Sequence, residues 1–147
     1  MNKANLPSFV RTLGDPHLGK KFTTGVPVHR RGDREKLVAE TFQNSFKNLD
    51  EIKLHICVGD LFDKFRVPEE VILFAAQTYR NAAEYNPDTQ FIVLRGNHDA
   101  SRDTDFKSSF DVFTALVGSV ENIFVVDNLV GLVSLEEETE FARGRLG

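Results

Sequence analysis

Three short stretches of the sequence combine glycine with residues that can bind metals. They read "GDPHLG" at residues 14–19, "GDLFD" at 59–63 and "GNHD" at 96–99, and each follows an apolar run. Carboxylate, imidazole and amide oxygen together suit manganese, iron or zinc better than a metal that prefers thiolates. Any one stretch alone is ordinary turn chemistry, because glycine, aspartate and asparagine are common in turns. Three such stretches in one chain are far less ordinary and indicate a metal site.

The apolar runs before these stretches are predicted to be β-strands. They cover Phe9 to Leu13, Leu54 to Val58 and Phe91 to Leu94. Short apolar runs bounded by turn residues are typical of buried strands. A fourth strand is expected in "NIFVVD", and we consider a fifth in "LVGLVSLE".

Helices are predicted between the strands. The first begins at Asp33 as its N-cap, the second has Pro68 at its start and runs to about Tyr85, and the third is "SSFDVFTALVG". One face of the first helix carries apolar residues at intervals of four, four and three, namely Val38, Phe42, Phe46 and Leu49. The alternation of strand and helix predicts an α/β fold with a mostly parallel sheet, flanking helices and right-handed crossovers.

The strand ends explain why a buried run is followed by polar residues. Open α/β sheets bind ligands at the carboxyl ends of their strands. Side chains that are up to 84 positions apart in sequence would then meet at one edge. These candidate site residues are Asp15, His17, Asp60, Asp63, Asn97, His98 and Asp99. Within this set, Asp63 and Asp99 are candidates for orienting a ligand or a histidine instead of binding the metal themselves.

Composition bounds the remaining possibilities. The chain of 147 residues is 41% hydrophobic and 27% charged, which is typical of one soluble domain. We expect a domain over 1–135 and a charged tail over 136–147. No apolar run is long enough for a membrane span and the start lacks a secretory pattern, so we expect a cytoplasmic protein without membrane contact. Cys57 and His55 are expected in the core, and His29 in a solvated loop.

The three stretches, in this order and each after a strand, resemble the first three motifs of the calcineurin-like metallophosphoesterases. The finer pattern is most similar to the SbcD-type DNA nuclease subunits of bacteria and phages. Protein phosphatases of the superfamily show Asp-Arg-Gly after the second motif and Asn-His-Glu in the third. This chain has "DKF" and "NHD" at these places, which favours the nuclease branch. The resemblance spans residues 8 to about 126 and implies about half of the two-sheet sandwich of that family.

The resemblance also implies roles for single residues. Asp15 and His17 would bind a first metal, Asp60 would bridge two metals and Asn97 would bind the second. His98 would meet the scissile phosphate and stabilise or protonate the leaving oxygen. Two cations close together can clamp a phosphodiester and activate a bridging water. Asp99 would hold the His98 ring. The expected cofactor is one or two divalent ions, with Mn²⁺ as the expected metal.

The later motifs of the family supply further histidines, and here no histidine follows His98. Three explanations stay open. The chain is a fragment or split product completed by a second chain, a reduced enzyme with fewer or weaker metals, or a catalytically reduced protein that binds or regulates a nuclease and ATPase complex. A small phosphomonoesterase is a weaker alternative. Metal affinity falls when ligands are lost, so the second and third explanations predict weak metal binding.

A basic loop follows the first stretch. "GKKFTTGVPVHRRGDR" contains the cations Lys20, Lys21, Arg30, Arg31 and Arg34. Beside a metal centre, such a loop is expected to hold a phosphate backbone through contacts that are sensitive to salt and blind to sequence. Taken alone, it would be read as a solubilising loop. DNA is therefore the expected substrate, and the resemblance adds an SMC-like ATPase subunit and a homodimer as expected partners.

Overall fold

The structure, a computed structural model, describes residues 9–96 and 108–126. The expected fifth strand, the tail at 136–147, and Asn97, His98 and Asp99 lie outside the described residues. The elements in chain order are β1 Phe9–Leu13, the 3-10 turn η2 Val28–Arg30, α1 Asp33–Asn44, β2 Ile52–Cys57, α2 Glu69–Tyr85, β3 Gln90–Leu94, α3 Ser109–Val117 and β4 Ile123–Val126. None of the described helices is both long and apolar enough to cross a membrane.

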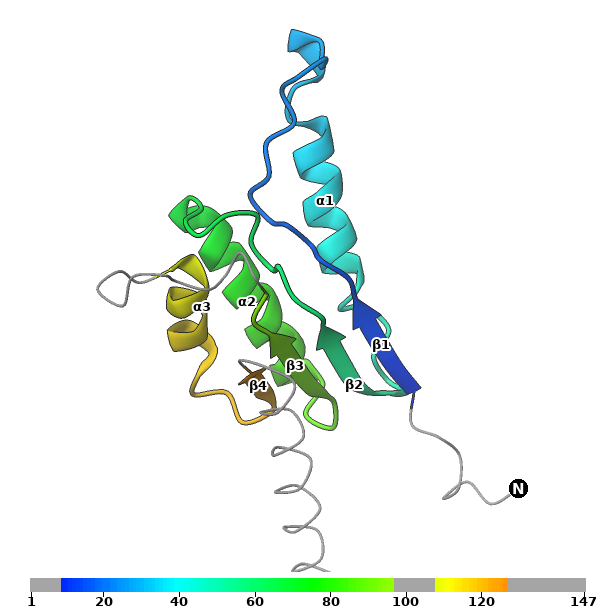
Figure 1. The fold of residues 1–147 in the computed structure, drawn as a ribbon. Coiled ribbons are helices and arrows are strands. Elements are labelled where there is room, and N and C mark those ends of the chain that lie inside the picture. The colour runs from blue at the N-terminus through cyan, green and yellow to red at the C-terminus, as the bar shows by residue number, and fades with distance from the viewer. Residues whose placement is uncertain (1–8, 97–107, 127–147) are drawn as a thin grey trace, which may run out of the picture.

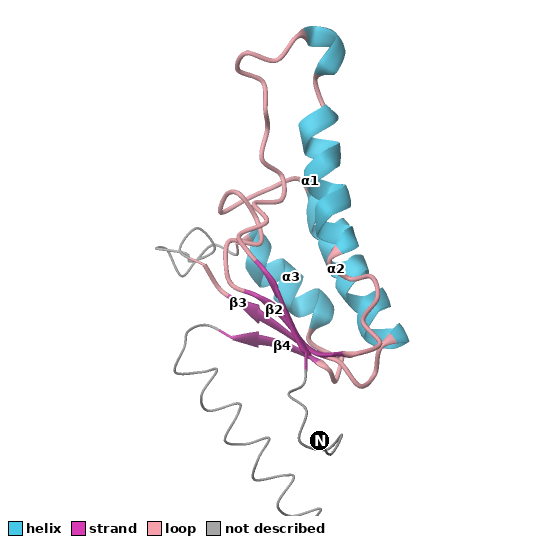
Figure 2. Cartoon of the chain, turned by 90° about the vertical axis from the view of Figure 1, so that its right-hand side faces the viewer, coloured by secondary structure: helices cyan, strands magenta, loops and turns pink. Residues whose placement is uncertain are grey.

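The four strands form one sheet in the order β1-β2-β3-β4, and every neighbouring pair is parallel. This confirms the α/β fold with a parallel sheet and flanking helices that the sequence predicts. The three helices lie on the same face of the sheet (Figures 1 and 2). Since each strand is placed beside the preceding one, crossovers of a single hand bring every helix to one face.

The hydrophobic core lies between the helices and this face of the sheet and is rich in aromatic rings. The ring of Tyr79 from α2 packs edge-on against Phe113 of α3 and Phe91 of β3. His55 of β2 belongs to the same cluster, with its ring stacked 4.4 Å from that of Phe46. It is fully buried, as is Cys57, so both expectations for these residues are confirmed.

The first helix differs from its prediction at both ends. Gly32, at a φ of 95°, is the N-cap, and Asp33 is the first helical residue. Glycine adopts this left-handed conformation without a steric cost, so it replaces the expected aspartate cap. The helix ends at Asn44, and Phe46 is buried from the turn that follows. The apolar interval continued past the helix because that turn still faces the core.

The opposite face of the sheet is also apolar. Side chains alternate between the faces of a strand, and Ile56, Ile92 and Phe124 lie side by side across three strands on the face away from the helices. With Leu94 and Val126, which pair further along, they stand outside the core cluster. None of the described helices covers this face (Figure 2). The described part of the chain is thus a single helical layer on a sheet with two apolar faces.

The burial of His55 makes stability depend on pH. Burial lowers the pKa of this histidine to about 4 from an ordinary value of 6.5. The unfolded chain then binds more protons between these two values, so stability is fully present above pH 6.5 and falls as the pH is lowered towards 4. The loss for this one group is on the order of 3 kcal/mol.

Replacing His55 with phenylalanine should remove this part of the pH dependence while keeping a ring against Phe46. Urea unfolding followed by circular dichroism at pH 7 and pH 5 measures it in both proteins. We expect the free energy of unfolding to fall less between these pH values in the variant. An equal fall in both proteins would show that His55 titrates normally in the folded state.

Candidate metal centre

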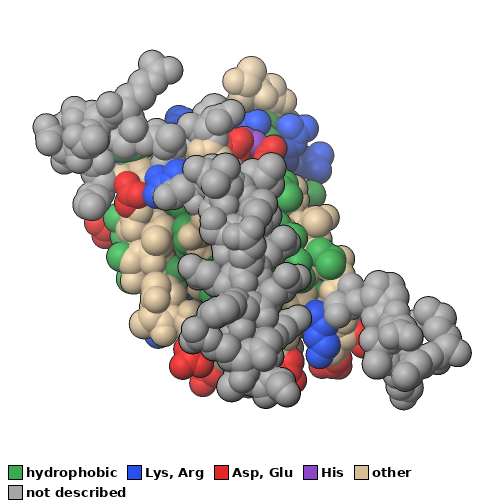
Figure 3. Space-filling model, turned by 60° about the horizontal axis from the view of Figure 1, so that its bottom comes forward, with side chains coloured by type: hydrophobic (Ala, Val, Ile, Leu, Met, Phe, Trp, Pro, Cys, Tyr) green, Lys and Arg blue, Asp and Glu red, His purple; other side chains and the backbone are tan. Residues whose placement is uncertain are grey.

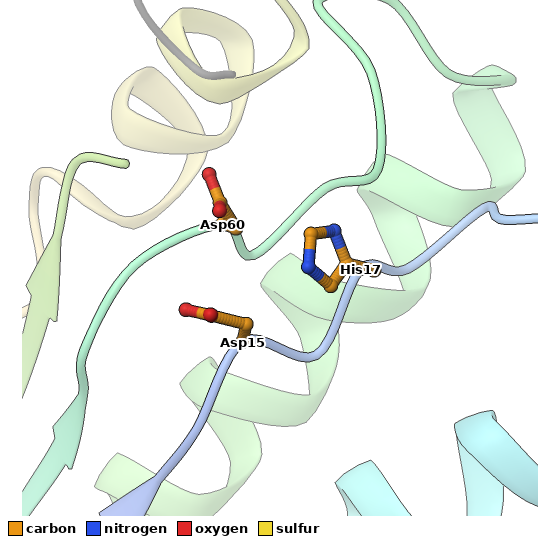
Figure 4. Close-up of side chains that lie close together, drawn as sticks. All are labelled: Asp15, His17 and Asp60. Atoms are coloured by element: carbon orange, nitrogen blue, oxygen red, sulfur yellow. The ribbon is translucent and has the colours of Figure 1, made fainter. Parts of the chain in front are cut away.

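Three of the candidate ligands meet at the carboxyl edge of the sheet. Asp15, His17 and Asp60 each offer a ligand atom, and these atoms lie within 4.8 Å of one another. Two come from the loop after β1 and one from the loop after β2, and their side chains lie side by side in Figure 4. Such convergence is expected where neighbouring parallel strands end.

Backbone hydrogen bonds join the two loops that carry these residues. The N–H of His17 donates to the carbonyl of Asp60 at 2.9 Å, and the N–H of Leu18 donates to the carbonyl of Leu61 at 2.9 Å. The N–H of Asp63 returns a bond to the carbonyl of Leu18 at 2.9 Å. These bonds continue the parallel pairing of β1 and β2 beyond the strand ends, so the two loops are joined by the same kind of hydrogen bond as the strands.

Buried side chains anchor the joined loops to the core. Leu18, the residue after His17, is 3% exposed, and Leu61, the residue after Asp60, is fully buried. His17 and Asp60 have positive φ angles of 47° and 46°. Non-glycine residues rarely adopt this conformation, and it persists only where the surrounding structure enforces it. The apolar neighbours therefore fix the unusual backbone that turns both ligands towards each other.

The glycine of the third stretch has a specific role. A Cβ atom at Gly96 would clash with the backbone nitrogen and the carboxylate of Asp60. Gly59 is in the left-handed region, with a φ of 138°, and a Cβ there would stand 3.5 Å from the Cα of Gly96. Glycine at position 96 allows the loops after β2 and β3 to touch, and glycine at position 59 permits the left-handed backbone there. Gly96, the one residue of the third stretch that the structure describes, thus lies at the same edge as the other two stretches.

Asp63 lies behind the histidine of the site. Its Oδ1 is 3.5 Å from Nδ1 of His17, with the two side chains 18% and 32% exposed. This distance is longer than a hydrogen bond but close enough for the carboxylate to favour one orientation of the imidazole. The sequence-based suggestion that Asp63 orients a histidine is consistent with this placement.

The donor set suits a divalent cation. Two carboxylates and one imidazole match the ligands that manganese, iron and zinc accept. Asp15 is exposed, and His17 and Asp60 are partly buried, so the group is accessible to a ligand from solvent. Asp15, His17 and Asp60 are therefore the residues of the described chain that would hold the ion. The roles predicted for Asn97, His98 and Asp99 stay predictions.

Sequence reasoning did not single out two residues that border the site. Arg95 precedes Gly96, and its Nη2 lies 2.7 Å from Oδ1 of Asp111 at the start of α3. The sequence contains one signal for part of this arrangement: Ser108 and Asp111 have the spacing of a capping box at a helix start. Nothing in the sequence linked that box to Arg95.

Comparison with known families agrees with this geometry. The family model for calcineurin-like phosphoesterases matches residues 12–145. The chain belongs to this family, whose members are metal-dependent phosphoester hydrolases. No curated protein matches the chain. The family match runs into residues 136–145, which we set apart as a tail, and that boundary stays a prediction.

Replacing Asp60 with asparagine should weaken metal binding because it removes a charged ligand at the centre of the group. We expect the affinity for Mn²⁺ to fall by on the order of 100-fold. Electron paramagnetic resonance measures it through the signal of the free ion. Asp88→Asn is the matched control, since Asp88 is an exposed carboxylate just before β3, at the opposite edge of the sheet. Equal affinity in the Asp60 variant and the wild type would place the ion elsewhere.

Proposed function

We propose that the chain is a metal-dependent phosphodiesterase that acts on DNA, of the SbcD-like nuclease branch of its family. The observation that carries this proposal is the cluster of Asp15, His17 and Asp60 at the carboxyl edge of the parallel sheet. Mn²⁺ is the proposed ion, with one or two bound. As a nuclease without a membrane span among its described helices, the protein would work in the cytoplasm.

In this proposal, different residues of the chain have different roles in the reaction. The ion held by Asp15, His17 and Asp60 would supply a Lewis acid that polarises the phosphate and lowers the pKa of water. We assign a further ligand role to Asn97. His98 would donate a proton to the leaving oxygen, and Asp99 would keep its ring oriented.

A basic arm supports DNA as the substrate. Residues 20–34 project away from the sheet between β1 and α1 (Figure 1), and their five cations are exposed. Asp33 is the one acidic residue of the arm, so the arm is positively charged although the whole chain has a net charge of −4. In Figure 3, lysine and arginine side chains gather at the same end of the molecule as a group of acidic and histidine side chains. Positive charge beside the site suits a polyanion better than a small monoester.

Contacts at its base close the arm into a loop. The N–H of Phe22 donates to Oε1 of Glu35 at 2.6 Å. This bond is the main cause that lowers the pKa of Glu35, so the carboxylate is charged at neutral pH. The Phe22 ring lies 5.4 Å from Nζ of Lys20 and 5.8 Å from Cζ of Arg34. The beginning and end of the arm are therefore held together next to His17.

Hydrolysis of linear double-stranded and single-stranded DNA tests the proposal. The wild type, Asp60→Asn and His98→Ala are each assayed with Mn²⁺ and with a chelator. We expect cleavage that requires Mn²⁺ and that each substitution reduces by at least about 100-fold, as losses of general acids and metal ligands do. Cleavage of p-nitrophenyl phosphate alone would instead identify a small phosphomonoesterase.

The alternative is a protein that binds or regulates a nuclease and ATPase complex without cleaving DNA. Apolar side chains on the sheet face that none of the described helices covers favour it, because Ile56 and Phe124 there are only partly buried and apolar surface commonly serves protein contacts. The proposed partners are an SMC-like ATPase subunit, a second chain that completes the site, or a second copy. A folded protein that binds such a partner equally well with and without His98→Ala would support this alternative.

Removing charge from the arm should weaken DNA binding in a manner that depends on salt. We expect the double variant Arg30→Ala, Arg31→Ala to bind a DNA duplex more weakly and to lower the slope of log affinity against log salt by about two. Fluorescence anisotropy with Ca²⁺ in place of Mn²⁺ measures both quantities. The control is Lys47→Ala, Lys53→Ala, which removes the same charge from exposed positions outside the arm. Equal slopes in the two double variants would exclude the arm as the DNA contact.

A further inference from the structure

We infer that Arg95 is a positioning residue of the metal site: its ion pair with Asp111 holds Gly96 against the Asp60 carboxylate. The inference rests on the proposed metal site and adds a residue that neither the motifs nor the ligand cluster includes. It follows from contacts on both sides of Arg95, which connect α3 to the loops after β2 and β3.

Arg95 is fixed by both its backbone and its side chain. Its backbone N–H donates to the carbonyl of Val126 at 2.9 Å, which continues the pairing of β3 with β4. Its Nη2 lies 2.7 Å from Oδ1 of Asp111, and its Cζ lies 4.7 Å from the centre of the Phe110 ring. The arginine and aspartate side chains are 21% and 25% exposed, so water only partly screens the pair.

The partner of Arg95 is itself held in place. The N–H of Ser108 donates to Oδ2 of Asp111 at 3.0 Å, and the N–H of Asp111 donates to Oγ of Ser108 at 3.0 Å. Partial burial works to raise the pKa of Asp111, but hydrogen bonds from Arg95 and Ser108 outweigh it and lower the pKa. The aspartate is thus charged at neutral pH and uses one oxygen for the helix and the other for the arginine.

The same helix start also reaches the loop after β2. The N–H of Ser109 donates to the carbonyl of Phe65 at 2.9 Å, and the N–H of Val67 donates to Oγ of Ser109 at 2.9 Å. The loop that carries Asp60 and Asp63 is therefore tied to the residues that anchor Arg95. The start of α3 thus supports both the loop after β2 and Arg95 at the end of β3.

Gly96 transmits the position of Arg95 to the metal ligand. It is the next residue in the chain, and its Cα lies so close to Asp60 that a side chain there would clash with the carboxylate. Asp60 has a φ of 46° and depends on its surroundings to keep that conformation. A shift of Gly96 would release Asp60 from the orientation in which it faces Asp15 and His17.

A purely structural role would be to hold α3 on the body of the protein. Arg80 of α2 offers the matched control, because its Nη1 donates to the carbonyl of Leu116 at 2.7 Å. This bond ties the other end of α3 and does not involve Gly96. Arg80→Ala should therefore remove one arginine hydrogen bond that holds α3 and leave the loops at the site unchanged.

The test compares Mn²⁺ affinity in the wild type, Arg95→Ala, Arg95→Lys and Arg80→Ala, measured by electron paramagnetic resonance of the whole chain. We expect Arg95→Ala to lower the affinity by about tenfold or more, as loss of a supporting group commonly does. Lysine should recover part of the affinity, and Arg80→Ala should leave it unchanged at a similar melting temperature. Equal effects of Arg95→Ala and Arg80→Ala would overturn the inference.

A second readout needs no metal and separates this inference from the proposed function. Hydrogen exchange of the His17 and Leu18 amides, which donate to Asp60 and Leu61, reports how firmly the loops are joined. We expect faster exchange of both amides in Arg95→Ala and no change in Arg80→Ala. If the wild type cleaves no DNA but the two variants differ in exchange as expected, the proposed nuclease activity is refuted and the positioning role is supported. Unchanged exchange in Arg95→Ala would refute the positioning role even if the wild type is a nuclease.

Discussion

The continued pairing of the loops after β1 and β2 is the constraint on which the site depends. Each backbone hydrogen bond between them contributes only about 1 kcal/mol, but they connect segments that are already fixed by a sheet. Leu18 and Leu61 then insert into the core, so the bonds cannot break without exposing apolar surface. The carboxylates of Asp15 and Asp60 are kept close together, in spite of their mutual repulsion, because the loops that carry them are joined and anchored in this way.

Much of the fold follows from local sequence signals. β1 has the predicted bounds, and the other strands differ from theirs by at most two residues at an end. Short apolar runs and glycine-aspartate ends are local, and parallel pairing follows from the alternation with helices. The meeting of Asp15, His17 and Asp60 follows from the same reasoning, because successive parallel strands end at one edge.

What the sequence did not reveal depends on contacts through space. The link between Arg95 and Asp111 joins a strand end to a helix start, and neither residue alone differs from an ordinary surface charge. The close approach of Gly96 to Asp60 is equally invisible, since glycine after a strand is common. The end of α1 was misplaced because Phe46 continues the apolar interval from a turn.

The strand order β1-β2-β3-β4 has a consequence for how the protein is made. Each new strand pairs with the one that precedes it in the chain, so the sheet can grow in the order of synthesis. Asp15, His17 and Asp60 all precede α2, which means that the ligand cluster is on the ribosome-distal part of the chain when β3 and β4 emerge. The nascent chain thus presents the candidate ligands Asp15, His17 and Asp60 first, and Arg95 and α3 follow afterwards.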